Sequence, residues 1–184
     1  MQIIRFADLK AESWRNGGGV TREIASQPND WRVSIADVTK AGDFSHFPGM
    51  ERVLTVIEGE LLFLTVDGAE HPTEKYRPFR FSGEASTTSA LPTGDIRDLN
   101  VITRTGAFKG YTSIIELSKK RSKPLWEGQF GVLLQGQATV SDDTHDPEAL
   151  ERYDAVVGSD VDTPEILGRG FLAVVSIDPV AEQP

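Results

Sequence analysis

The sequence predicts an all-β protein, a barrel or a sandwich made of short strands. Short runs in which apolar and polar residues alternate recur along the chain, and they are rich in Val, Ile, Thr and Phe. Gly, Pro, Asp and Ser interrupt these runs at short intervals, as turns between strands require. Helical patterns are nearly absent. The best is DPEALERY (146–153), in which Pro147 and Glu148 suit the first turn of a helix.

The alternating runs are the expected strands, and they follow one another along the whole chain. They cover 20–26, 31–38, 52–66, 76–83, 99–105, 112–117, 130–140, 153–158 and 171–177. Most of them have the length and composition of strands in an ordinary sandwich or barrel.

A weak internal repeat indicates two similar halves. The run VIEGELLFLTVDG (56–68) is echoed by LLQGQATVSDDT (133–144), and each has a glycine between two apolar segments, as a hairpin or a bulge needs. We therefore expect two small antiparallel β-barrels in one continuous fold, residues 1–106 and 107–184. The alternative is a chance echo, because all-β sequences resemble one another.

Composition restricts the classes of partner. The 184 residues include 28 acidic and 19 basic side chains, so the formal charge is −9 and neither nucleic acid nor an anionic membrane is an expected partner. Cysteine is absent, which excludes disulfides and thiolate metal sites. No apolar run has the length of a membrane span or of a signal sequence, and we expect the protein in the cytoplasm.

Familiar catalytic and metal-binding patterns are missing. The three histidines, His46, His71 and His145, are too far apart in sequence to form a metal-ligand cluster, so we expect no metal and no cofactor. There is no GxSxG elbow and no GxxxxGK[ST] loop. The triple glycine at 17–19 leads into a strand pattern rather than a helix, so it does not fit a phosphate loop.

Two arginines stand out instead. Alternation along WRVSIADV puts Arg32, Ser34 and Ala36 on one face, which faces either a ligand cavity or solvent. Arg52 follows the aromatic, turn-rich stretch FSHFPGME. A guanidinium between apolar walls binds carboxylates well, because its planar fork matches both oxygens. The alternative for Arg52 is a surface ion pair with Glu51 or Glu58.

Four motifs then occur in order: WRNGGGVTRE, WRVSIADV, FSHFPGMERVLTVIEG and FSGEASTTSALPTGDIRDLN. They cover most of residues 14–100, and in order and spacing they resemble the HutD/Ves family of the cupin superfamily. The resemblance implies a bicupin of two jelly-roll-like barrels, with residues 107–184 matching only loosely. It also implies a link to histidine utilisation, and binding of a small acidic metabolite such as formylglutamate without established enzyme activity.

The resemblance also identifies what replaces the metal of other cupins. Their carboxylate ligand stands seven residues before the glycine of a VLEG-like strand, and here that position is Arg52. The histidine of their second motif corresponds to Arg97. Asp98 and Asn100 match the family's DxN segment and share one face. Guanidinium groups at two ligand positions indicate a site for an anion.

We therefore expect a small-molecule-binding protein, a sensor or regulator that holds a small carboxylate metabolite in its N-terminal barrel. The expected ligand-binding residues are Trp14, Asn16, Glu23, Arg32, Phe44, Phe47, Arg52, Arg97, Asp98 and Asn100. The glycine bend should bring Asn16 and Glu23 to the same cavity. One alternative is a metal-independent isomerase or hydrolase that uses Glu23, Asp98 or His46 as general acid or base. Another is a structural module whose second barrel forms a homodimer surface.

Overall fold

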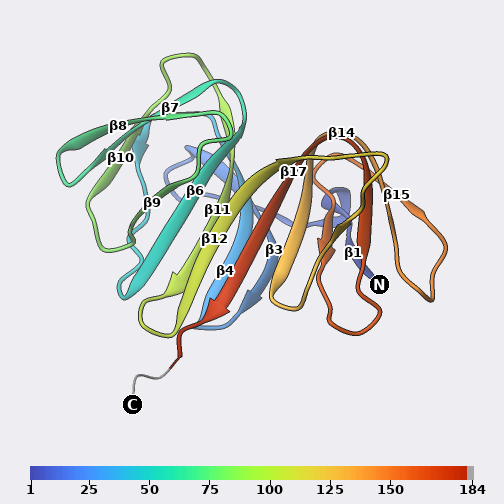
Figure 1. Ribbon diagram of the computed structural model, residues 1–184. Coiled ribbons are helices and arrows are strands. Elements are labelled where there is room, and N and C mark those ends of the chain that lie inside the picture. Colours follow the sequence, from blue (N-terminus) through green and yellow to red (C-terminus); the bar gives the residue numbers. More distant parts are fainter. Residues whose placement is uncertain (182–184) are drawn as a thin grey trace. The chain divides into compact units, whose positions relative to one another are not determined.

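A computed structural model describes residues 1–181, and it is almost entirely β-structure (Figure 1). Within those residues the one helical element is a single 3-10 turn, η1 (Phe6–Asp8). All strand pairs with assigned register are antiparallel. The all-β prediction is confirmed. No helix within residues 1–181 has the length and hydropathy needed to cross a membrane.

The chain forms two compact units. The N-terminal unit contains Lys10–Gly110 together with residues 179–181. The C-terminal unit contains Tyr111–Asp178 together with the first nine residues, Met1–Leu9. The chain therefore contributes its first strand to the unit formed by its second half.

The N-terminal unit has two sheets. The six-stranded sheet has the order β2-β3-β4-β11-β6-β9, with β2 (Ala11–Ser13), β3 (Gly19–Gln27), β4 (Trp31–Val38), β11 (Ile96–Arg104), β6 (Met50–Glu58) and β9 (Phe79–Ser82). The four-stranded sheet has the order β5-β10-β7-β8, with β5 (Gly42–Asp43), β10 (Thr87–Ala90), β7 (Leu61–Val66) and β8 (Ala69–Glu74). One apolar cluster joins both sheets, since Leu54 and Val56 of β6 belong to it with Leu62 and Leu64 of β7.

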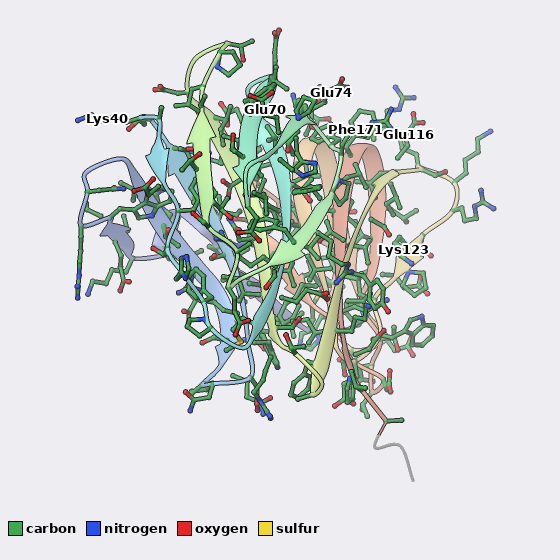
Figure 2. The ribbon with its side chains drawn as sticks, turned by 90° about the vertical axis from the view of Figure 1, so that its left-hand side faces the viewer. Lys40, Glu70, Glu74, Glu116, Lys123 and Phe171 are labelled. Atoms are coloured by element: carbon green, nitrogen blue, oxygen red, sulfur yellow. The ribbon has the colours of Figure 1, made fainter. Side chains whose placement is uncertain are left out.

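β8 is an edge strand that carries charge. Glu70 and Glu74 are exposed on it, as Figure 2 shows, and Pro72 removes one backbone donor. Charged residues and proline on an edge strand disfavour pairing with other chains.

The strand register across the centre of the six-stranded sheet places several polar side chains side by side on one face, which we call the polar grid. Ile102 of β11 lies opposite both Arg32 of β4 and Arg52 of β6. Two residues back, Asn100 lies opposite Ser34, and a further two residues back Asp98 lies opposite Ala36. Because side chains alternate with period two, these residues all project from the same face of the sheet.

The C-terminal unit contains one seven-stranded sheet with the order β1-β16-β14-β17-β12, where β13 also pairs with β17 and β15 with β14. Its strands are β1 (Gln2–Ile4), β12 (Phe108–Glu116), β13 (Lys123–Pro124), β14 (Gln129–Ser141), β15 (Glu148–Leu150), β16 (Ala155–Val157) and β17 (Glu165–Pro179). Its core is aliphatic, with Leu125, Leu133, Ile166 and Leu172 fully buried.

The prediction of a helix at 146–153 is wrong. Glu148–Leu150 forms β15, which pairs with β14 so that Leu150 lies opposite Ala138. Leu150 is buried in the aliphatic core. A segment this short has little intrinsic helix stability, and pairing with an existing strand outweighs its propensity.

All the predicted strands are present. The two glycines of the internal repeat lie in different structural settings. Gly59 lies in the turn between β6 and β7, whereas Gly136 lies inside β14 opposite Gly170. Both have positive φ. A Cβ on Gly136 would lie 2.0 Å from the Arg169 carbonyl oxygen, so no other residue fits there. Sequence alternation missed the short strands β1, β2, β5, β8, β10, β13 and β15.

Candidate functional site

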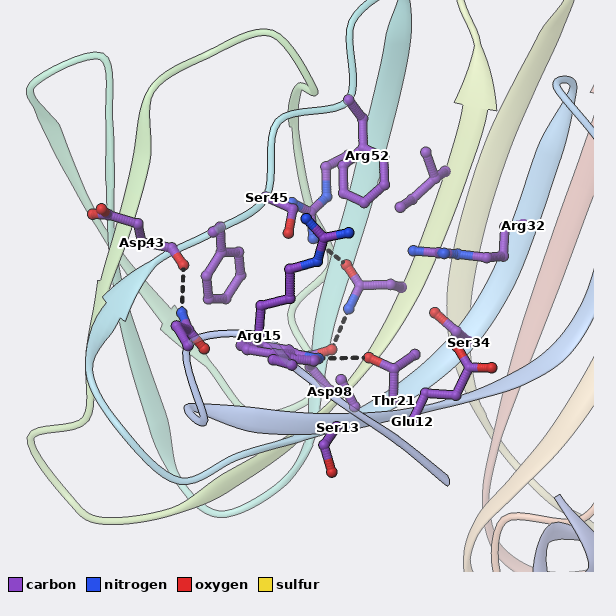
Figure 3. Close-up of a pocket in the computed structure, with 17 residues that line it drawn as sticks. Glu12, Ser13, Arg15, Thr21, Arg32, Ser34, Asp43, Ser45, Arg52 and Asp98 are labelled. Atoms are coloured by element: carbon purple, nitrogen blue, oxygen red, sulfur yellow. Dashed lines mark hydrogen bonds between the residues drawn. The ribbon is translucent and has the colours of Figure 1, made fainter. Parts of the chain in front are cut away.

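The N-terminal unit contains a cavity of about 550 Å³ on the polar grid of its six-stranded sheet (Figure 3). Its walls come from β4, β6 and β11, from the segment around the glycine triplet, and from the segment between β5 and β6. The lining residues are Glu12, Ser13, Trp14, Arg15, Asn16, Thr21, Arg32, Ser34, Ala36, Asp43, Phe44, Ser45, Phe47, Arg52, Asp98, Asn100 and Ile102.

Arg52 is the most deeply buried cation of this cavity. Its side chain is 6% exposed, and its guanidinium carbon lies 5.0–5.3 Å from the ring centres of Phe44, Phe47 and Phe81. Nη2 donates a hydrogen bond to Asn100 Oδ1 at 2.8 Å, while Nε is buried without a partner. Burial lowers the pKa of Arg52 to about 10, a shift that Asp98 opposes and Arg32 reinforces. The guanidinium remains charged at neutral pH.

Arg32 lies beside the same aromatic ring. Its guanidinium carbon is 5.3 Å from the Phe47 ring centre, and its Nε is also buried without a hydrogen-bond partner. Arg32, Ser34 and Ala36 all line the cavity, while Val33 and Ile35 are fully buried on the opposite face of β4. The alternation of β4 therefore points Arg32 at a cavity and not at bulk solvent.

Asp98 is buried with only one oxygen satisfied. Its side chain is 0% exposed, Oδ1 accepts a hydrogen bond from Asn100 Nδ2, and Oδ2 has no partner. Burial raises the pKa of Asp98 to about 7; the positive charge of Arg52 lowers it, and the negative charge of Asp37 raises it. A carboxyl group with such a pKa changes charge near neutral pH.

The glycine triplet forms the wall next to Trp14. The Trp14 indole donates to Thr21 Oγ1 at 2.8 Å and contacts Phe44 edge to face at 5.9 Å. A Cβ on Gly19 would lie 2.5 Å from the Asp37 carbonyl oxygen and 3.0 Å from the Trp14 ring. The third glycine therefore allows the backbone to approach the ring. Asn16 Oδ1 accepts from the Gly18 amide at 2.8 Å, which fixes the bend.

Three expected site residues lie elsewhere. Arg97 does not line the cavity, because its Nε donates to Asp37 Oδ1 at 2.5 Å and its Nη1 lies 3.5 Å from Glu58 Oε2. His46 is exposed and also outside the lining. His46 lies in the loop between β5 and β6, and Arg97 lies beside a register shift in β11, so strand alternation does not fix where either side chain points.

Glu23 is likewise outside the cavity. Thr21 occupies the cavity wall, and Glu23 stands two residues farther along β3, a displacement of roughly 7 Å. The Glu23 carboxylate accepts a hydrogen bond from Ser26 and lines a separate, smaller depression with Trp31 and Met50. The glycine bend thus brings Asn16 to the cavity, but not Glu23.

Sequence reasoning also missed part of the lining. Ile102 continues the alternation of Asp98 and Asn100, so the DxN segment could have identified it. Thr21 lies on the regular strand β3, where the sequence analysis singled out Glu23 instead. The others gave no signal, because they lie in irregular or very short segments: Glu12, Ser13, Arg15, Asp43 and Ser45. Arg15 matters most, since Figure 3 shows it reaching over the cavity towards Arg52.

The cavity lining thus presents hydrogen-bond donors whose chemistry suits an anion. The Nε groups of Arg32 and Arg52 are buried donors without protein acceptors, and Phe44 and Phe47 screen them from water. Such donors favour a planar anion that can accept two bonds at once. In residues 1–181 no three His, Asp or Glu side chains come close enough to hold a metal ion.

Comparison with known proteins places this geometry in context. Residues 6–174 match the HutD family. A Pseudomonas putida protein described only as an uncharacterised 21.2 kDa protein in the hutC 3′ region is 39% identical over 109 residues, 55% of this chain and 57% of that protein. Protein Ves of Escherichia fergusonii is 37% identical over 123 residues, 63% of this chain and 64% of that protein. The matched stretch therefore spans less than two thirds of these relatives.

Solved structures match over nearly the whole chain. A Pseudomonas aeruginosa protein of unknown function superposes with a TM-score of 0.85 at 28% identity, covering 98% of this chain and 99% of that one. HutD from Pseudomonas fluorescens, solved in a formate condition, gives a TM-score of 0.81 at 27% identity, with the same coverage. A cupin barrel protein from Leptotrichia buccalis, 11% identical, gives 0.63 and covers 97% and 96%, which shows the likeness of fold alone.

Proposed function

The chain belongs to the HutD family, and from this premise we propose that its N-terminal unit binds a small carboxylate metabolite without a metal. In this proposal the protein is a sensor or regulator in histidine degradation, and formylglutamate is the first ligand to test. We also propose that each of the two units is a cupin barrel, so that the whole chain is a bicupin.

The pair Arg32 and Arg52 carries the proposal. Both guanidinium carbons lie within 5.3 Å of the Phe47 ring centre, and each has a buried Nε without a protein acceptor. Like charges held together in a cavity are stabilised by an anion, and a carboxylate can accept from two guanidinium donors. Hydrogen bonds to a charged group contribute about 1.5–3 kcal/mol each, which suffices for specific recognition.

Two relatives support the choice of ligand class. One was solved in a formate condition, and formate is the simplest carboxylate. The other is described by its place beside hutC. Both observations concern those proteins, and they motivate ligands from histidine degradation for this chain.

Calorimetric titration tests the proposal. Formylglutamate, urocanate, formate and glutamate are added in turn, and at least one is expected to bind with Kd below 1 mM, a binding free energy beyond about −4 kcal/mol. Arg52→Met, which keeps the apolar stem, should weaken binding about 10- to 150-fold, the equivalent of one lost charged hydrogen bond. Arg97→Gln is the matched control outside the cavity and should bind like wild type. Submillimolar binding of none of the four, or equal binding by Arg52→Met, would overturn the proposal.

A second candidate is a metal-independent isomerase or hydrolase acting on a small acidic metabolite. The observation that favours it is Asp98, because burial raises its pKa to about 7, the range suited to a general acid or base. In this case Asp98, and neither Glu23 nor His46, would carry the proton. Turnover of one of the four carboxylates that disappears in Asp98→Asn, while binding persists, would identify the protein as an enzyme.

A further inference from the structure

Asp98 and Arg52 are linked through a single amide. Asn100 accepts a hydrogen bond from Arg52 Nη2 with its oxygen and donates one to Asp98 Oδ1 with its nitrogen. All three side chains are buried, Arg52 at 6%, Asp98 at 0% and Asn100 at 6% exposed. In a medium of low dielectric constant, the charges of Asp98 and Arg52 therefore interact over the intervening amide.

Apart from Arg52, which acts through Asn100, no cation among the described residues stabilises the ionised form of Asp98 at close range. In residues 1–181 no ion pair within 4.0 Å includes Asp98, and its Oδ2 has no hydrogen-bond partner. The charged groups around it are Arg52 on β6, Arg32 and Asp37 on β4, and, at the mouth, Arg15, Glu12 and Asp43. Asp37 is held by Arg22 and Arg97 outside the cavity. Arg52 is thus the main positive charge that stabilises an ionised Asp98.

We propose that Asp98 is the resident counter-ion of Arg52, and that a carboxylate entering the cavity displaces it electrostatically, so that binding is coupled to uptake of a proton by Asp98. The inference rests on the proposed function, since it needs a carboxylate beside Arg52. Asp98 acts here as a positioning residue: through Asn100 it orients the Arg52 fork, and it competes with the ligand for the same charge.

Proton uptake is expected because the bound carboxylate replaces Asp98 as the negative charge that neutralises Arg52. In the empty cavity Arg52 lowers the pKa of Asp98, partly offsetting the effect of burial. A bound carboxylate cancels that positive charge, so the ionised form of Asp98 loses its support and the neutral form is favoured. The bound state then holds one more proton than the free protein wherever free Asp98 is ionised. The proton comes from solvent and Asn100 continues to donate to Oδ1.

Calorimetry in two buffers of different ionisation enthalpy measures this coupling directly. The probe is formate, which carries a carboxylate and no second titratable group, with formylglutamate in its place should formate not bind. At pH 8 the wild-type protein should take up close to one proton per ligand, and at pH 5.5 close to none, because Asp98 is already neutral there. Above pH 7 the affinity should fall by up to about tenfold per pH unit, the slope of one linked proton.

Asp98→Asn supplies the decisive comparison. This variant keeps the size of the side chain and an oxygen for Asn100, but it cannot ionise, so uptake should vanish and affinity should no longer change with pH. At pH 8 it should bind more tightly than wild type. Glu58→Gln, which alters a surface carboxylate outside the cavity, should retain the uptake of wild type.

The outcomes separate two kinds of failure. Carboxylate binding at pH 8 without proton uptake would overturn the counter-ion inference and leave the proposed function intact. Binding of no carboxylate at either pH would overturn the proposed function itself. Should Asp98→Asn fail to fold, the wild-type protein in two buffers still decides, because uptake at pH 8 that disappears at pH 5.5 requires a group titrating near neutrality in the site.

Discussion

The two units treat a buried aspartate in opposite ways. Asp154 of the C-terminal unit, 2% exposed, has both oxygens occupied: Oδ1 accepts from the Phe6 amide at 3.0 Å, and Oδ2 accepts from Arg5 at 2.6 Å and from the Glu151 amide at 2.9 Å. Asp98 of the N-terminal unit, more deeply buried, has one occupied oxygen and no close cation. A saturated carboxylate stabilises a fold, whereas an unsaturated one is available to a ligand.

The interiors of the two units also differ in how many polar side chains they bury. In the residues described, the C-terminal unit buries the carboxylates of Asp154 and Asp142, and its core is otherwise aliphatic. The N-terminal unit buries Ser34, Arg52, Asp98 and Asn100 around a cavity. Burial of polar groups lowers stability unless each finds a partner. We infer that the buried polar groups around the cavity make the N-terminal unit less stable than an apolar core of the same size would be.

The largest expected effect is on the saturated aspartate. Asp154→Ala should lower the free energy of unfolding by about 2–4 kcal/mol, because it leaves two backbone amides without their acceptor and removes one of the three acceptors of Arg5. Urea unfolding followed by circular dichroism measures the change. Carboxylate affinity at the folded protein should stay as in wild type. A loss below 0.5 kcal/mol would remove the contrast between the two aspartates.

The second prediction concerns pH. Because the folded-state pKa of Asp98 is raised to about 7, the native state keeps a proton that the unfolded chain loses near pH 4. Stability from this group is therefore present at low pH and is lost as pH rises towards 7. Between pH 5 and 7, where carboxylates of low pKa stay ionised, the loss should be about 2–3 kcal/mol at 1.36 kcal/mol per pH unit.

The difference between wild type and Asp98→Asn isolates this effect. All other titratable groups are the same in the two proteins, so their contributions cancel in this difference. Unfolding free energies measured at pH 5, 6, 7 and 8 should diverge in favour of the variant as pH rises. Parallel curves would mean that Asp98 stays ionised, or stays neutral, over the whole range.

The third prediction separates stability from binding at one residue. Arg52→Met should change the free energy of unfolding by no more than about 1–2 kcal/mol, because two effects oppose each other. The variant removes a buried cation near Arg32 and puts an apolar chain between Phe44 and Phe81. It also takes the donor from Asn100 and the positive charge from Asp98, which then favours its neutral form. Under the proposed function, the same variant should lose carboxylate affinity. Thermal unfolding at pH 7.5 measures the first effect. Strong destabilisation would show that Arg52 is a structural part of the fold.

The smallest effect is expected at Arg97. Arg97→Gln removes contacts with Asp37 and Glu58 that are partly exposed, and such pairs contribute about 0–1 kcal/mol. Urea unfolding should therefore shift little, and the pH dependence of carboxylate binding should be that of wild type. A large loss of affinity in this variant would mean that the boundary of the site extends beyond the cavity described.

Regular strands made much of the site predictable from the sequence. Period-two alternation along β4 and β11 put Arg32 beside Ser34, and Asp98 beside Asn100, on common faces, and both faces meet in the cavity. Arg52 was identified by its aromatic approach, and Phe44 and Phe47 do surround it. Within a strand, the direction of a side chain follows from counting, so local pattern suffices.

Where the strand ends, or where tertiary pairing decides, the sequence was insufficient. Arg97 lies at a register shift of β11, and its ion pairs with Asp37 and Glu58 hold it outside the cavity. Arg15 enters the lining from an irregular bend, whose direction no periodicity encodes. Within the segment 146–153, Glu148–Leu150 forms a strand because β14 offers an edge for it to pair with, and only the assembled sheet provides that edge.

The route of the chain has a consequence for biosynthesis. β1 is synthesised before its partner β16, which lies about 150 residues later along the chain, since Gln2 pairs with Val157. At 5–20 residues per second, β1 waits on the order of 10 to 30 s on the ribosome before that partner emerges. Residues 10–110 are complete well before then and can fold during the wait. The cavity described above would thus be in place before β1 has a partner strand.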